Sequence, residues 1–191
     1  MRKSFALLTV MAMSSLASNA EAGFLGKGMS ATYMTPDLAT VYPFASFSPA
    51  TFTVTDDPGF ETIGIVEGVT SLPVQFTDDT LTIQLSSTLP PDPKWNAAAF
   101  NGILFALQGS GTLGILTATV DASTTLAGFN DSRVLITDTM IGINWENLTY
   151  QSAGDQVVIK FTFVPEPSSL AMAAIGGAAL LACGIRRRSA G

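Results

Sequence analysis

The sequence of 191 residues contains no histidine and a single cysteine, Cys183. Without histidine it cannot build a Ser-His-Asp or Cys-His nucleophile system, and it lacks both the usual zinc ligand sets and the commonest general base near neutral pH. It also has no P-loop, no G-x-S-x-G elbow and no dinucleotide-binding glycine motif. These absences exclude the commonest hydrolase, zinc-enzyme and nucleotide-binding classes.

Carboxylates are the catalytic groups that remain. A glycoside hydrolase needs two of them roughly 5 to 9 Å apart, and Asp56-Asp57 and Asp78-Asp79 are adjacent pairs. Adjacent residues of a strand point to opposite faces, however, and both pairs lie in turn sequences, where Asp is favoured for local hydrogen bonds. We therefore expect no catalytic residue, no cofactor and no enzyme activity, with a hydrolase of matrix polysaccharide as the rare alternative. Turn aspartates would also suit a weak calcium site, but without a D-x-D-x-D-G loop we assign no metal ligand.

The first residues have the three parts of a secretory signal peptide. Arg2 and Lys3 form a basic start, Phe5 to Leu16 is mostly apolar, and Ala20-Glu21-Ala22 has the small-x-small form of a signal peptidase site. We expect residues 1–22 to be removed by cleavage after Ala22, with cleavage after Ala20 as the alternative.

The last residues combine an uncharged run with a basic stop. The 18 residues from Ser168 to Ile185 carry no charge, and as a helix they span roughly 27 Å, near the lower limit for a membrane. The arginines at 186–188 follow directly, which argues against a buried core helix and for a cytoplasmic end under the positive-inside rule. We predict a single transmembrane helix at about 169–185, with the upstream domain outside. Pro165 and Pro167 separate the two because neither continues a strand or a helix interior.

Val164-Pro165-Glu166-Pro167, the apolar run and the stop of Arg186, Arg187 and Arg188 together resemble the PEP-CTERM sorting signal of bacteria that make exopolysaccharide. The resemblance covers roughly the last 27 residues. It implies that an exosortase, a membrane transpeptidase, recognises the tail, cuts near Pro-Glu-Pro and releases or transfers the domain. We therefore expect an exported protein that is first anchored in the inner membrane and then acts at the cell surface, in the envelope or in an exopolysaccharide (biofilm) matrix.

Residues 23–163 are expected to form one exported domain, an all-β antiparallel sandwich. Apolar and polar residues alternate along 81–86 and 157–163, which is typical of strands with one buried face, and turn sequences separate several further candidates. The segment from Gly23 to Ser48 lacks clear alternation and is expected to pack loosely. Because Cys183 lies in the predicted membrane helix, the domain has no disulfide.

The domain is acidic, with 4 Lys and Arg against 13 Asp and Glu residues. Such a surface repels nucleic acid and suits neutral glycans or cations. A glycan-binding module would need exposed aromatic rings, and Trp95, Trp145, Tyr33, Tyr42 and Tyr150 are the candidates. Trp145 ends an apolar run and keeps its alternation, so we expect it in the core. Trp95 follows a rigid proline-rich segment and is the candidate for a surface contact with polysaccharide.

Overall fold

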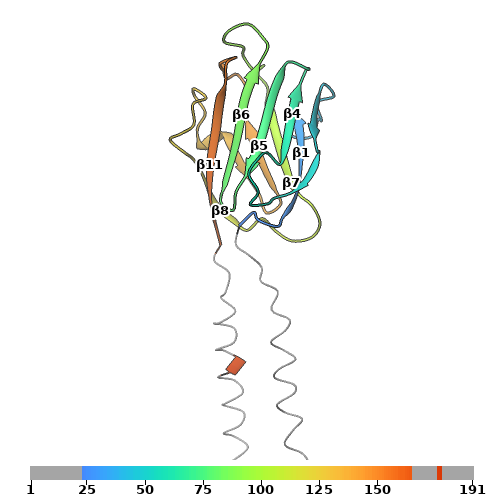
Figure 1. Ribbon diagram of the computed structural model, residues 1–191, viewed down its shortest axis with the longest axis vertical. Helices are drawn as coiled ribbons and strands as arrows, with labels where there is room; N and C mark the ends of the chain where they lie inside the picture. The colour runs from blue at the N-terminus through green and yellow to red at the C-terminus, as the bar shows by residue number, and fades with distance from the viewer. Residues whose placement is uncertain (1–22, 165–175, 178–191) are drawn as a thin grey trace, which may run out of the picture. The chain divides into compact units, whose positions relative to one another are not determined.

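The computed structural model describes residues 23–164 and 176–177. The part from Gly23 to Val164 is a compact unit, built from strands and one 3-10 turn, η2 (Asp131–Arg133) (Figure 1). The strands are β1 (Gly28–Met34), β2 (Ala45–Ser48), β3 (Thr51–Thr53), β4 (Thr62–Val66), β5 (Thr70–Phe76), β6 (Thr80–Ser87), β7 (Gly102–Leu107), β8 (Ile115–Val120), β9 (Val134–Ile136), β10 (Met140–Asn144) and β11 (Asp155–Phe163).

These strands form two antiparallel sheets. One has the strand order β3-β1-β7-β10-β9 and the other the order β2-β4-β5-β6-β11-β8. Neighbours along the chain pair directly in β4-β5-β6, where Thr62 lies opposite Val74 and Val74 opposite Ile83. The all-β, antiparallel prediction is confirmed.

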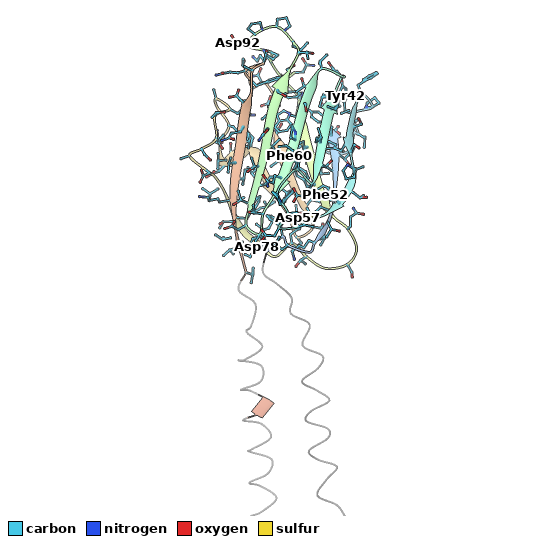
Figure 2. All side chains as sticks on the ribbon, in the orientation of Figure 1. Tyr42, Phe52, Asp57, Phe60, Asp78 and Asp92 are labelled. Carbon is cyan, nitrogen blue, oxygen red and sulfur yellow. The ribbon has the colours of Figure 1, made fainter. Side chains whose placement is uncertain are left out.

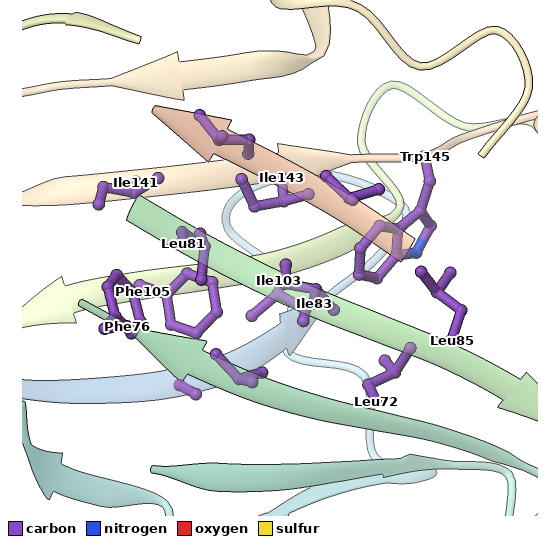
Figure 3. Close-up of a cluster of buried hydrophobic side chains, with 14 of the residues drawn as sticks. Leu72, Phe76, Leu81, Ile83, Leu85, Ile103, Phe105, Ile141, Ile143 and Trp145 are labelled. Atoms are coloured by element: carbon purple, nitrogen blue, oxygen red, sulfur yellow. The ribbon is translucent and has the colours of Figure 1, made fainter. Parts of the chain in front are cut away.

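A single apolar core lies between the two sheets. In β5, β6 and β11 every second side chain is buried, as alternation along a strand requires. Figure 3 shows side chains of both sheets meeting in this core; among those less than 2% exposed are Leu72, Phe76, Leu81, Ile83, Leu85, Ile103, Phe105, Ile141, Ile143 and Trp145. Burial of each aliphatic or aromatic side chain contributes about 1.5–3 kcal/mol before entropy is counted.

The leading segment is packed, not loose as the sequence suggested. β1 is an inner strand that pairs with β3 on one side and β7 on the other, and Met29, Ala31 and Tyr33 on its core face are buried. The alternation of apolar and polar residues is weak in the sequence of β1. Its core positions carry methionine, alanine and tyrosine, which differ little in polarity from the Ser30 and Thr32 between them.

Phe24 joins the beginning of the domain to its end. Its ring is fully buried and makes edge-on contacts with Phe76 at 5.1 Å, Phe161 at 5.0 Å and Phe163 at 5.1 Å between centroids. Phe161 and Phe163 belong to the last strand, so residues 24 and 163 lie at the same end of the sandwich. Figure 2 labels Asp78, whose carbonyl accepts from the Phe24 amide, at this end, and Tyr42 and Asp92 toward the other.

The predicted signal peptide and almost all of the predicted transmembrane helix lie outside the described residues. Across 23–164 and 176–177, no helix has the length and apolar character needed to cross a membrane.

Candidate functional site

A stack of aromatic rings closes the end of the sandwich that lies away from Phe24. Trp95 lies between Trp145, at 5.5 Å and 28°, and Tyr150, at 5.0 Å and 21° between ring planes. Tyr33 of β1 approaches Trp95 to 5.9 Å and Trp145 to 6.2 Å. Four of the five tyrosine and tryptophan candidates named from the sequence therefore meet in one cluster.

The expectation that Trp95 is exposed is wrong. Its side chain is only 8% exposed, whereas Trp145 is fully buried as expected. The cause is a backbone pairing between distant segments: the Trp95 amide donates to the Leu148 carbonyl at 2.9 Å, and the Tyr150 amide donates to the Pro93 carbonyl at 3.0 Å. This pairing turns the Trp95 ring inward, against the rings of the other segment.

A chain of hydrogen bonds runs beneath the stack. The Trp145 Nε1 donates to the Tyr33 hydroxyl at 2.8 Å, and the Tyr33 hydroxyl donates to the Asn101 Oδ1 at 2.8 Å. Burial raises the pKa of the Tyr33 phenol well above its ordinary value, so it remains a neutral donor at physiological pH. Tyr150 shares a 2.8 Å hydrogen bond with Thr70 at the start of β5. By contrast, the buried Trp95 Nε1 has no hydrogen-bond partner among the described residues.

A pocket of about 110 Å³ opens beside this stack. Its walls include Tyr33, Tyr42, Glu67, Trp95, Asn101 and Tyr150. At about 30 Å³ for each water molecule, the pocket has room for three or four waters. It therefore has room for a small polar group.

A larger, open groove of about 640 Å³ shares the Tyr42 and Glu67 walls of the pocket. The Phe44 ring is 68% exposed and meets the Tyr42 ring edge-on at 5.6 Å. Ile65 of β4, which is 39% exposed, adds a further apolar surface. Rings of this kind supply flat apolar faces at the surface of the domain, and Glu67 adds a charged acceptor beside them.

Glu67 is held in an unusual backbone conformation. With Gly68 it lies in the turn between β4 and β5, at φ values of 53° and 72°. Such turns favour Asn, Asp or Gly at the first position, because both central residues need positive φ. Two contacts fix Glu67 there: its amide donates to the Phe44 carbonyl at 2.7 Å, and its carboxylate accepts from the Tyr42 hydroxyl. The hydrogen bond to this carboxylate raises the pKa of Tyr42.

Comparison with known proteins finds a match in the part of the sequence that follows the sandwich. Residues 163–188 match the family model described as the PEP-CTERM protein-sorting motif. The chain carries a PEP-CTERM sorting motif. The match supports exosortase-dependent sorting of an exported protein, with the exosortase as processing partner. No curated protein and no solved structure matches the chain.

The PEP-CTERM match begins at Phe163, the last residue of β11, so the motif follows the sandwich directly. Val164 is half exposed, and its amide donates to the Gly114 carbonyl at 2.8 Å. The other predicted tail and cleavage residues lie outside the described residues; they are Ala20, Ala22, Pro165, Glu166, Pro167, Arg186, Arg187 and Arg188.

The adjacent carboxylates Asp78 and Asp79 lie in the turn between β5 and β6. Asp79 accepts hydrogen bonds from the Thr77 hydroxyl at 3.5 Å and the Thr80 hydroxyl at 2.9 Å, the local turn contacts expected from the sequence. Within the described part of the chain, no three acidic or cysteine side chains gather into a group that could hold a metal ion.

Phe44 and Glu67 were not proposed from the sequence. Phe44 lies in a segment without strand alternation, and Glu67 is separated from it by more than twenty residues. The local sequence features that mark these two groove residues are the Tyr42-Pro43-Phe44 run and the Glu67-Gly68 turn. Only the pairing of β2 with β4 shows that the two belong to one groove.

The hydrogen-bond chain predicts that two similar substitutions differ in effect. Tyr33→Phe leaves the buried Trp145 Nε1 and Asn101 Oδ1 without a partner, and we expect it to lower the free energy of unfolding by about 2–3 kcal/mol. Tyr42→Phe removes a hydrogen bond at the surface and should cost no more than about 1 kcal/mol. Urea unfolding of the two variants and the wild type measures the difference. Equal losses would contradict the structural role assigned to the Tyr33 hydroxyl.

Proposed function

We propose that this chain is a non-enzymatic protein of the cell envelope or the exopolysaccharide matrix, anchored transiently in the inner membrane and processed by an exosortase. The observation that carries this proposal is the PEP-CTERM match over residues 163–188, directly after a domain that has its own core. The sandwich would be the cargo that this tail sorts.

The arrangement of the domain supports this proposal. Phe24 holds the first residues against β11, so both ends of the domain leave from one end of the sandwich. The groove lined by Tyr42, Phe44 and Glu67 lies toward the other end, beyond Thr70 at the start of β5. β5 has seven residues, and at about 3.3 Å each they separate the two ends by roughly 20 Å. Cutting near Pro165 would therefore leave the groove untouched.

Replacing both Pro165 and Pro167 with alanine is expected to abolish processing. The substituted tail keeps its apolar run and its arginines, so the chain should accumulate uncut in the membrane fraction of the native host. Immunoblots of membrane and extracellular fractions measure this. The matched control replaces Pro90 and Pro91, which lie in an exposed loop of the domain, and should be processed like the wild type. Equal release of both variants would contradict recognition through the Pro-Glu-Pro element.

The groove favours a second candidate function, a carbohydrate-binding surface module. Exposed aromatic faces stack on the apolar faces of sugar rings, and a carboxylate accepts hydrogen bonds from sugar hydroxyls. The groove offers both, through Phe44, Tyr42 and Glu67. The adjoining pocket adds room for one substituent of a sugar ring. The buried Trp95 proposed from the sequence would form part of that pocket's wall and not a stacking face.

If the groove binds glycans, Phe44→Ala should weaken binding at least tenfold, which corresponds to about 1.4 kcal/mol. Isothermal titration with exopolysaccharide isolated from the host, and with cellulose and chitin oligosaccharides, measures this loss. Leu116→Ala is the control, because Leu116 of β8 is 61% exposed but lies outside the groove. Binding that survives Phe44→Ala unchanged, or no binding by the wild type, would contradict this second function.

A further inference from the structure

The carboxylate of Asp78 lies against the backbone of Gly23. A Cβ atom placed on Gly23 would overlap the Asp78 Oδ1 and come within 2.8 Å of its Oδ2, so no larger residue fits there without moving the aspartate. Bonds at Cα are about 1.5 Å long, which puts the Gly23 nitrogen no more than about 5 Å from the Asp78 carboxylate. That separation is within the range over which two charges interact strongly.

The contacts that hold Gly23 in place come from residues after it. The Phe24 amide donates to the Asp78 carbonyl at 2.9 Å, and the Leu25 amide lies 3.4 Å from the Asp78 Oδ1. The fully buried Phe24 ring fixes the segment in the core. These contacts hold the beginning of the described domain against Asp78.

Asp78 has no basic partner among the described residues. The ion pairs formed within 23–164 are Arg133–Glu146 and Lys160–Asp121. The charged groups nearest in these segments and in the neighbouring strand β11 are Lys27, Asp79 and Lys160; Asp79 adds negative charge, and Lys160 pairs with Asp121 and interacts with Asp79. At this end of the domain, the carboxylate of Asp78 therefore faces the backbone nitrogen of Gly23, and Asp79 is its neighbour in the chain.

We propose that Asp78 is the docking site for the amino terminus of the mature protein. The inference rests on the proposed export, and specifically on cleavage after Ala22. Hydrolysis of the peptide bond between Ala22 and Gly23 consumes one water, leaves a carboxylate on Ala22 and frees the Gly23 amine, which takes up a proton at neutral pH. The new ammonium forms an ion pair with Asp78 that the precursor cannot make. Cleavage after Ala20 would place the ammonium two residues away, before Glu21.

This ion pair would stabilise the domain only after export. The pH dependence of this added stability follows from the pKa of the amine. A partner carboxylate raises that pKa above the ordinary range of about 7.7–8.0. The added stability is then complete below the ordinary pKa and is lost as the pH rises through the raised one.

The test measures the pKa of the Gly23 amine in the mature protein, exported as the full chain and purified from the host. Trace acetylation at a series of pH values, followed by mass spectrometry of the amino-terminal peptide, gives the midpoint of amine reactivity. We expect Asp78→Asn to lower this midpoint by about 0.6 pH unit, since two charges about 5 Å apart interact by roughly 0.8 kcal/mol even in water and about 1.36 kcal/mol corresponds to one pKa unit. Asp79→Asn is the matched control and should lower it by less than half as much. The amide oxygen introduced by Asp78→Asn can still accept from the Leu25 amide, so the substitution changes charge more than shape.

The outcomes separate this inference from the proposed function. A mature chain that begins at Gly23 with the same midpoint in the wild type and in Asp78→Asn overturns the ion pair and leaves export intact. A mature chain that begins at Glu21 overturns it as well. If the host yields only chain that still carries residues 1–22, the proposed export fails together with the inference.

Discussion

Contact between the inner faces of the two sheets is the interaction on which the rest of the structure depends. Residues 23–164 contain no cysteine, so no covalent bond links one sheet to the other. Stability must come from the shared core, where strands from both ends of the domain meet: β1 near its beginning and β11 at its end. Phe24 and Phe161 lie in direct contact in that core. Loosening either end of the domain would therefore disturb the packing of both sheets.

The two ends of the sandwich have different chemistry because different contacts close them. At one end, three phenylalanine rings pack edge-on around Phe24, and Asp78 lies against the first residue of the domain. At the other end, stacked rings cover a chain of hydrogen bonds through Tyr33, and Tyr42 and Glu67 separate a small pocket from an open groove. The first end carries the end of β11, where the sorting motif begins in the sequence, whereas the second carries polar groups and exposed rings.

The sequence predicted those parts of the fold in which local pattern and tertiary environment agree. Leu81, Ile83 and Leu85 alternate with polar residues, and the structure buries all three on the core face of β6. The sorting tail was also recognisable, because its parts lie next to one another in the chain, and the family match confirms it. β1 was missed because the residues on its two faces differ little in polarity.

The candidate site was less predictable, because its contacts join distant segments. Trp95 is buried through pairing of the backbone with residues more than fifty positions away, and a proline-rich approach gives no hint of that pairing. Local alternation can predict a strand. It cannot predict whether a side chain is buried when distant parts of the backbone pair and decide its surroundings.

The central claim is that the sandwich is an exported cargo released through its tail. The intact mass of the mature protein, recovered separately from the membrane and extracellular fractions of its native host, tests this most directly. We predict an extracellular species that begins at Gly23 and ends near Pro167, with or without an added group. A single species that runs through Gly191 and is confined to the membrane fraction would contradict the account.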